Sequence, residues 1–133
     1  MADNRIVTAT IGKDLYRTEL KTSIHILYSD EPTEAGGKDS GPTPGDLLRM
    51  SLASCTAITL RMYADRKKWH VEEIEVTVSN ERDQHKTTFQ CDISVRGNID
   101  EIQRARMLEI ANAFPVHKVL KNPILVESEM TAN

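Results

Sequence analysis

The stretch from Leu47 to about Arg66 has the spacing of a helix but almost no polar face. Its apolar residues fall on every side of that helix: Leu47, Leu48, Met50, Leu52, Ala53, Ala57, Ile58, Leu60, Met62 and Ala64. A helix of this kind is usually buried on most sides. In a chain of 133 residues, we therefore expect a long central helix that is wrapped by sheets, by other helices or by a second subunit.

The start of this helix is marked by local signals. The preceding segment, Asp30 to Asp46, holds four Gly and three Pro and is therefore expected to be a long loop. Thr43 is suited to cap the helix, and Pro44 to occupy its first position. Asp46 stands where the acidic residue of a capping box belongs. The loop therefore leads directly into a capped helix.

The remaining segments predict an α+β fold in a single domain, residues 1–133. Short alternating runs and turns predict an antiparallel meander at 5–11, 13–20 and 23–29. After the long helix, two strands joined by a charged turn are expected at 70–80 and 87–97. Helices are expected at 99–114 and 116–122, and a closing strand at 123–131. Strands and helices that are segregated along the chain are typical of α+β folds.

Composition narrows the classes of partner. The net charge is −3 and aromatic residues make up 5%, so neither a basic patch nor a base-stacking surface indicates nucleic acid. The longest nearly apolar stretch contains Arg49 and Arg61, which is poor for a membrane span. The first ten residues lack a signal-peptide pattern, and a cytoplasmic location is expected. We expect no membrane partner.

No metal or cofactor is expected. The histidines, His25, His70, His85 and His117, show no ligand spacing, and the two cysteines show no C-x-x-C spacing. Cys91 alternates with apolar neighbours on its strand, which favours a small residue facing the core.

Cys55 lies in the middle of the apolar helix among hydroxyl side chains. Ser51 and Thr59 fall on its helical face, and Ser54 and Thr56 flank it. The hydroxyls could donate hydrogen bonds to a thiolate and lower its pKa. They could equally donate to backbone carbonyls one turn back. The local pattern leaves both interpretations open.

Two segments make the chain recognisable: "DEPTEAGGKDSGPTPGDLLRMSLASCTAITLRMYADRKKW" and "IANAFPVHKVLKN". In this order and spacing they resemble the OsmC/Ohr superfamily of osmotically inducible and organic hydroperoxide resistance proteins, over about residues 6–130. The resemblance implies an OsmC-like fold, with antiparallel sheets around the long central helix. It also implies an intertwined homodimer, with two sites at the subunit interface.

The resemblance assigns roles to two residues. Cys55 matches the thiol that attacks a hydroperoxide, and Arg17 matches an arginine that assists it. The resemblance also implies an assisting glutamate at the start of the central helix, but this chain has Gly45 at that position. Asp46 is the next residue. As a capping residue, Asp46 has a structural explanation of its own.

The chain departs from the family's peroxidases at the second cysteine. The family's resolving cysteine precedes the "PVH" segment, where this chain has Phe114. Cys91 lies on a different strand, and we do not expect it to take over that role. His117 is retained from the family segment, and a structural role is favoured for it.

Three functions follow as hypotheses. The first is a redox or peroxide-stress role, as a one-cysteine, thiol-dependent hydroperoxide reductase in which an external thiol reduces Cys55. The alternative is a non-catalytic dimeric binding protein, with an apolar interfacial pocket near Phe114, Met50 and Met62. A purely structural dimer is the third. The partner is then a small hydroperoxide or an apolar ligand.

Overall fold

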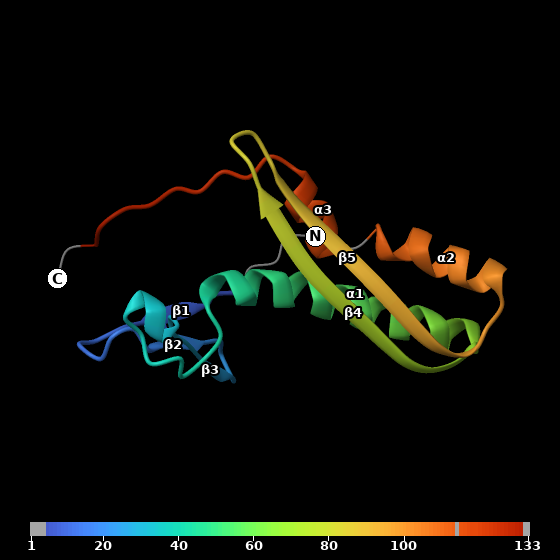
Figure 1. The fold of residues 1–133 in the computed structure, drawn as a ribbon, viewed down its shortest axis with the longest axis horizontal. Coiled ribbons are helices and arrows are strands. Elements are labelled where there is room, and N and C mark those ends of the chain that lie inside the picture. Colours follow the sequence, from blue (N-terminus) through green and yellow to red (C-terminus); the bar gives the residue numbers. More distant parts are fainter. Residues whose placement is uncertain (1–4, 114, 132–133) are drawn as a thin grey trace. The chain divides into compact units, whose positions relative to one another are not determined.

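The computed structural model describes residues 5–113 and 115–131. The chain divides into two compact units, Met1–Leu48 and Arg49–Asn133. Helices combine with antiparallel sheets in the order β-β-β-α-β-β-α-α (Figure 1). The predicted α+β class is therefore confirmed, while the interpretation of residues 1–133 as a single domain stays a prediction.

The first unit contains the expected three-stranded meander. Its strands, which pair antiparallel in the order β1-β2-β3, are β1 (Thr8–Thr10), β2 (Thr18–Lys21) and β3 (Ile26–Ser29). They are shorter than predicted. The hydroxyl of Thr22 accepts hydrogen bonds from the backbone N–H groups of Ile24 and His25. This turn occupies residues that the apolar alternation had predicted to be the start of the third strand.

The loop before the long helix is organised by one buried carboxylate. Asp30, 2% exposed, accepts hydrogen bonds from the backbone N–H groups of Tyr16, Lys38 and Ser40 and from the Ser40 hydroxyl. The hydroxyl and then the N–H groups hold the pKa of Asp30 well below its ordinary value. A short 3-10 helix, η1 (Thr33–Ala35), lies within the loop. The loop is therefore held by its own polar groups.

The long helix, α1 (Pro44–Lys67), begins with the capping box that the sequence predicts. The Asp46 N–H donates to Thr43 Oγ1 over 3.0 Å, and the Thr43 N–H donates to Asp46 Oδ2 over 3.1 Å. Two otherwise unpaired backbone donors are thereby satisfied.

The end of α1 is a Schellman motif. Lys68 takes a left-handed conformation with φ 60°. Its N–H donates to the carbonyl of Asp65, and the N–H of Trp69 donates to the carbonyl of Ala64. The motif stops the helix and fixes the direction in which Trp69 leaves it.

A long antiparallel ribbon follows, made of β4 (His70–Arg82) and β5 (Thr87–Asn98), as predicted. At the turn, Asp83 accepts hydrogen bonds from the N–H groups of His85 and Lys86. One face of the ribbon is half-buried, and it presents Ile74, Val76, Val78, Phe89, Cys91, Ile93 and Val95. The alternation of apolar and polar residues along each strand therefore predicted correctly which side chains form the ribbon's apolar face.

The core of the second unit lies where two helices and the ribbon meet. It contains Leu60 of α1 with Met107 and Ala111 of α2 (Glu101–Ala111). Half-buried side chains of both strands pack against this cluster, Ile74 and Ile93 among them. The core therefore joins α1, α2 and the ribbon.

The predicted closing strand at 123–131 is wrong. Beyond α3 (Pro115–Lys121), the described residues 122–131 form neither helix nor strand. Leu125 and Val126 are each 81% exposed. A strand needs a backbone partner as well as apolar residues, and no other described segment pairs with these residues.

The expected burial of α1 on most sides is only partly met within the chain. Leu52, Thr56 and Leu60 are buried. Met50, Ile58 and Met62 are more than half exposed. Among the residues that the structure describes, no helix has the length and apolarity needed to cross a membrane.

Candidate functional site

Cys55 lies in the middle of α1 as a free, half-buried thiol. Its side chain packs against the core cluster of Leu60, Met107 and Ala111. Ile93 of β5 packs against the same cluster. The thiol therefore packs against apolar side chains of the core while it keeps some exposure to solvent.

The neighbouring threonine hydroxyls serve the helix backbone. Thr59 Oγ1 donates to the carbonyl oxygen of Cys55 over 2.9 Å, and Thr56 Oγ1 donates to that of Leu52 over 2.8 Å. A hydroxyl has one proton to donate, so neither threonine donates to the sulfur in this arrangement. Of the two interpretations left open by sequence, the backbone one holds for Thr56 and Thr59. Ser51 is exposed on the same helix.

Arg17 lies in the first unit, immediately before β2. Its guanidinium carbon is 4.0 Å from the ring centroid of Tyr28 on β3, within cation–π range. Arg17 and Cys55 belong to different units, so their pairing stays a prediction. Asp46 is accounted for by the capping box.

A cavity of about 240 Å³ lies in the second unit, and it contains the second cysteine. It is lined by Leu52, Thr87, Thr88, Phe89, Cys91, His117, Leu120 and Lys121. Burial, and then Asp92, raise the pKa of the Cys91 thiol. Burial, and then Lys121, lower the pKa of His117. Both shifts favour the neutral forms, so the structure brings together a protonated thiol and a neutral imidazole.

Cys91 is half-buried on the apolar face of β5, as its alternation predicts, and both cysteines are free. Phe114, expected in place of the resolving cysteine, lies outside the described residues. Within residues 5–113 and 115–131, no group of three or more His, Cys, Asp or Glu side chains could hold a metal ion.

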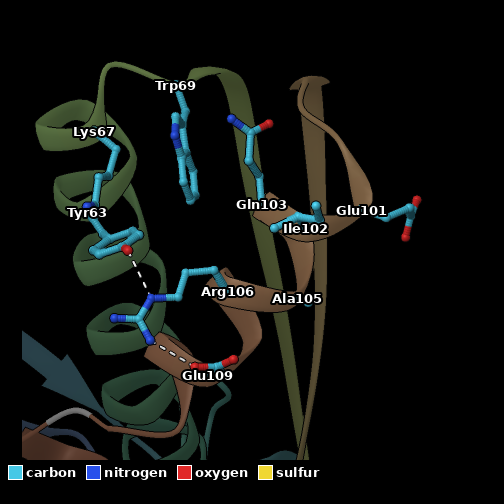
Figure 2. Close-up of a pocket in the computed structure, with 9 residues that line it drawn as sticks. All are labelled: Tyr63, Lys67, Trp69, Glu101, Ile102, Gln103, Ala105, Arg106 and Glu109. Atoms are coloured by element: carbon cyan, nitrogen blue, oxygen red, sulfur yellow. Dashed lines mark hydrogen bonds and ion pairs between the residues drawn. The ribbon is translucent and has the colours of Figure 1, made fainter.

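A larger cavity, of about 580 Å³, lies between the end of α1 and α2 (Figure 2). Its lining residues are Tyr63, Lys67, Trp69, Glu101, Ile102, Gln103, Ala105, Arg106 and Glu109. No sequence pattern predicted this cavity. A tyrosine, a basic run and the chain's one tryptophan, in "YADRKKW", are the local signal that could have pointed to it.

Comparison with known proteins defines the family. No curated protein sequence gives a significant match. Among solved structures, an OsmC-like protein from Mycoplasma pneumoniae has a TM-score of 0.76 at 16% identity, over 91% of this chain and 89% of that one. An organic hydroperoxide resistance protein OsmC from Legionella pneumophila has a TM-score of 0.61 at 20% identity, over 91% of each chain. One from Elizabethkingia anophelis has a TM-score of 0.60 at 17% identity, over 90% of this chain and 85% of that one.

These structures share the fold of this chain. The model of the family described as OsmC-like protein matches residues 37–129, which include Cys55, Cys91 and His117 but not Arg17. Since the match spans most of the sequence, the chain belongs to the OsmC-like protein family.

Proposed function

We propose that this chain is a one-cysteine, thiol-dependent hydroperoxide reductase with a role in redox or peroxide stress, in which Cys55 reacts. The observation that carries the proposal is the free thiol of Cys55, half-buried among apolar side chains within the family-matched segment. An organic hydroperoxide has an apolar body that such surroundings can accept. The names of the Legionella and Elizabethkingia relatives, organic hydroperoxide resistance proteins, support the same class of substrate.

The reaction needs one sulfur on the protein. The Cys55 thiolate attacks the terminal oxygen of ROOH, the O–O bond breaks, and the alkoxide leaves as ROH after it takes a proton. Cys55 is then a sulfenic acid. An external thiol condenses with it to give water and a mixed disulfide. A second thiol releases reduced Cys55 and forms the external disulfide.

Arg17 is proposed to stabilise the thiolate and the leaving alkoxide through its guanidinium. This role requires the first unit, from this chain or from a second copy, to bring Arg17 to Cys55. Cys91 is not proposed as a resolving thiol, because it lies half-buried on the apolar face of β5 and burial raises its pKa, which disfavours the thiolate.

A homodimer is part of the proposal. Met50, Ile58 and Met62 are spaced four and eight residues apart, so they lie along one side of α1, and all three are exposed within the chain. Covering such a stripe with a second copy removes apolar surface from water. Light scattering that finds a stable folded monomer at micromolar concentration would contradict the dimer.

The test of Cys55 uses the Cys91→Ala variant and one equivalent of an organic hydroperoxide. A dimedone-type probe should label Cys55, and a Cys55→Ser variant should take no label. If the hydroperoxide is not consumed and no label forms, the reductase proposal fails.

Arg17 has a matched control in Lys13, another exposed cation of the same unit. Alkylation rates of Cys55 as a function of pH report the pKa of its thiol. Arg17→Ala should move that titration to higher pH, and Lys13→Ala should leave it in place. Identical titrations in the two variants would remove Arg17 from the site.

A non-catalytic binding protein is the second candidate. The hydroxyls of Thr56 and Thr59 donate to backbone carbonyls, so they do not donate hydrogen bonds to the Cys55 sulfur. This observation favours the binding protein, because a reactive thiolate needs such donors. Under this alternative, organic ligands bind while added hydroperoxide persists.

A further inference from the structure

We propose that the cavity between the end of α1 and α2 binds a flat aromatic organic anion, such as an aryl carboxylate, at a site separate from Cys55. Tyr63 follows Cys55 by eight residues, or about 12 Å along the helix. Cys55 is not among the residues that line the cavity. The site is therefore independent of the reductase proposal.

The size and walls of the cavity suit a small organic molecule. Its volume of about 580 Å³ lies within the range of small-molecule sites, which are mostly apolar with a few polar groups. The rings of Tyr63 and Trp69 meet edge to face, with centroids 5.5 Å apart and planes at 80°. Ile102, on the cavity wall, is 81% exposed. A flat apolar ligand would cover this side chain and contact the aromatic wall.

Positive charge is concentrated beside the aromatic wall. Arg66 Cζ and Lys67 Nζ each lie 5.7 Å from the centroid of the Tyr63 ring, and Arg106 Cζ lies 5.8 Å from it. Arg66 does not line the cavity and Arg106 is paired with Glu109, so an anionic group placed at this rim is attracted chiefly by Lys67.

The carboxylates of the cavity offset this charge only in part. Glu109 is paired with Arg106 at 2.8 Å. Glu101 points away from the other labelled side chains in Figure 2. Lys67 forms no ion pair with another residue in the part of the chain that the structure describes. Its ammonium group is therefore available to a carboxylate.

The site is organised before any ligand binds. Arg106 Nε donates to the Tyr63 hydroxyl over 3.0 Å, and Tyr63 is 6% exposed (Figure 2). The backbone N–H of Trp69 donates to the carbonyl of Ala64, and the Trp69 side chain packs against the core cluster. A preorganised site loses less conformational freedom on binding.

The test uses Trp69, the only tryptophan of the chain, as a reporter. Its indole N–H gives one resonance in a proton–nitrogen correlation spectrum of the native protein. Naphthoate should shift this resonance saturably. Naphthalenemethanol, which has the same ring system without the charge, should shift it with weaker affinity.

Two variants separate charge from apolar contact. Lys67→Gln should weaken naphthoate binding about two- to fivefold and leave naphthalenemethanol binding unchanged. Lys118→Gln, which removes an exposed lysine of α3 that does not line the cavity, should change neither. Ile102→Ser should weaken both ligands, because the apolar wall is shared.

Three results would each overturn the proposal. The first is an indole resonance that does not respond to naphthoate. The second is equal naphthoate affinity in Lys67→Gln and Lys118→Gln. The third is Trp69 fluorescence that acrylamide cannot quench in the native protein, which would mean that a second copy covers the cavity.

Discussion

Lys68 carries a backbone strain that a single substitution should relieve. Its φ of 60° lies in the left-handed region, where a Cβ costs about 1–2 kcal/mol. Glycine has no Cβ, but it gives the unfolded chain more freedom, which offsets about 0.5–1 kcal/mol. The Lys68→Gly variant should therefore raise the free energy of unfolding by about 0.5–1 kcal/mol. Urea unfolding at fixed protein concentration measures this change.

Two controls isolate the backbone effect. Lys68→Ala removes the same charge and side chain but keeps the Cβ, so its stability should stay within about 0.5 kcal/mol of the native protein. Lys67→Gly places glycine within α1, one position earlier, and should destabilise by up to about 1 kcal/mol. If Lys68→Gly is no more stable than Lys68→Ala, the strain at this position is not real.

Three further predictions concern buried or half-buried groups. Leu60→Ala should lower the free energy of unfolding by about 2–5 kcal/mol in urea, because Leu60 is fully buried; a loss below about 1 kcal/mol would contradict its central place in the core. The pKa of Asp30 is lowered on folding, so its stabilisation is present above the ordinary value of 3.8 and is lost as pH falls below it. Asp30→Asn should therefore be less stable at neutral pH and should flatten the acid limb of a circular dichroism titration. The pKa of His117 is also lowered, so the free energy of unfolding should fall as pH drops below 6.5, and His117→Gln should remove that dependence. An unchanged pH profile in Asp30→Asn or in His117→Gln would refute the assignment for that residue.

Features set by neighbouring residues could be predicted from the sequence. The capping box of Thr43 and Asp46 needs only a three-residue spacing, and the ribbon needs only a period of two with a turn between its strands. The meander was predicted too, but its boundaries were not. There the Thr22 hydroxyl, rather than apolar alternation, determines where β3 begins.

Features that depend on tertiary contacts could not be predicted from the sequence. The large cavity joins Tyr63 and Trp69 to Arg106, and no local pattern brings together residues some forty positions apart. The segment 123–131 has strand-like residues, but these do not supply a backbone partner. The sequence allowed the Thr59 hydroxyl to donate either to the Cys55 sulfur or to a backbone carbonyl. Only the three-dimensional geometry shows that it donates to the carbonyl.

The β4–β5 ribbon has a kinetic consequence for folding. The paired residues of the two strands run from Arg82 opposite Thr87, beside the Asp83 turn, to His70 opposite Asn98. Strand pairing can therefore begin at the turn and extend outward one residue pair at a time. Once one residue pair has formed, the next pair closes only a small additional loop, so its entropic cost is low. Hairpins assemble in about 1–10 μs, whereas contacts between α1 and α2 must first close a loop of some forty residues. The ribbon is therefore expected to form early, as a template on which the two helices later pack.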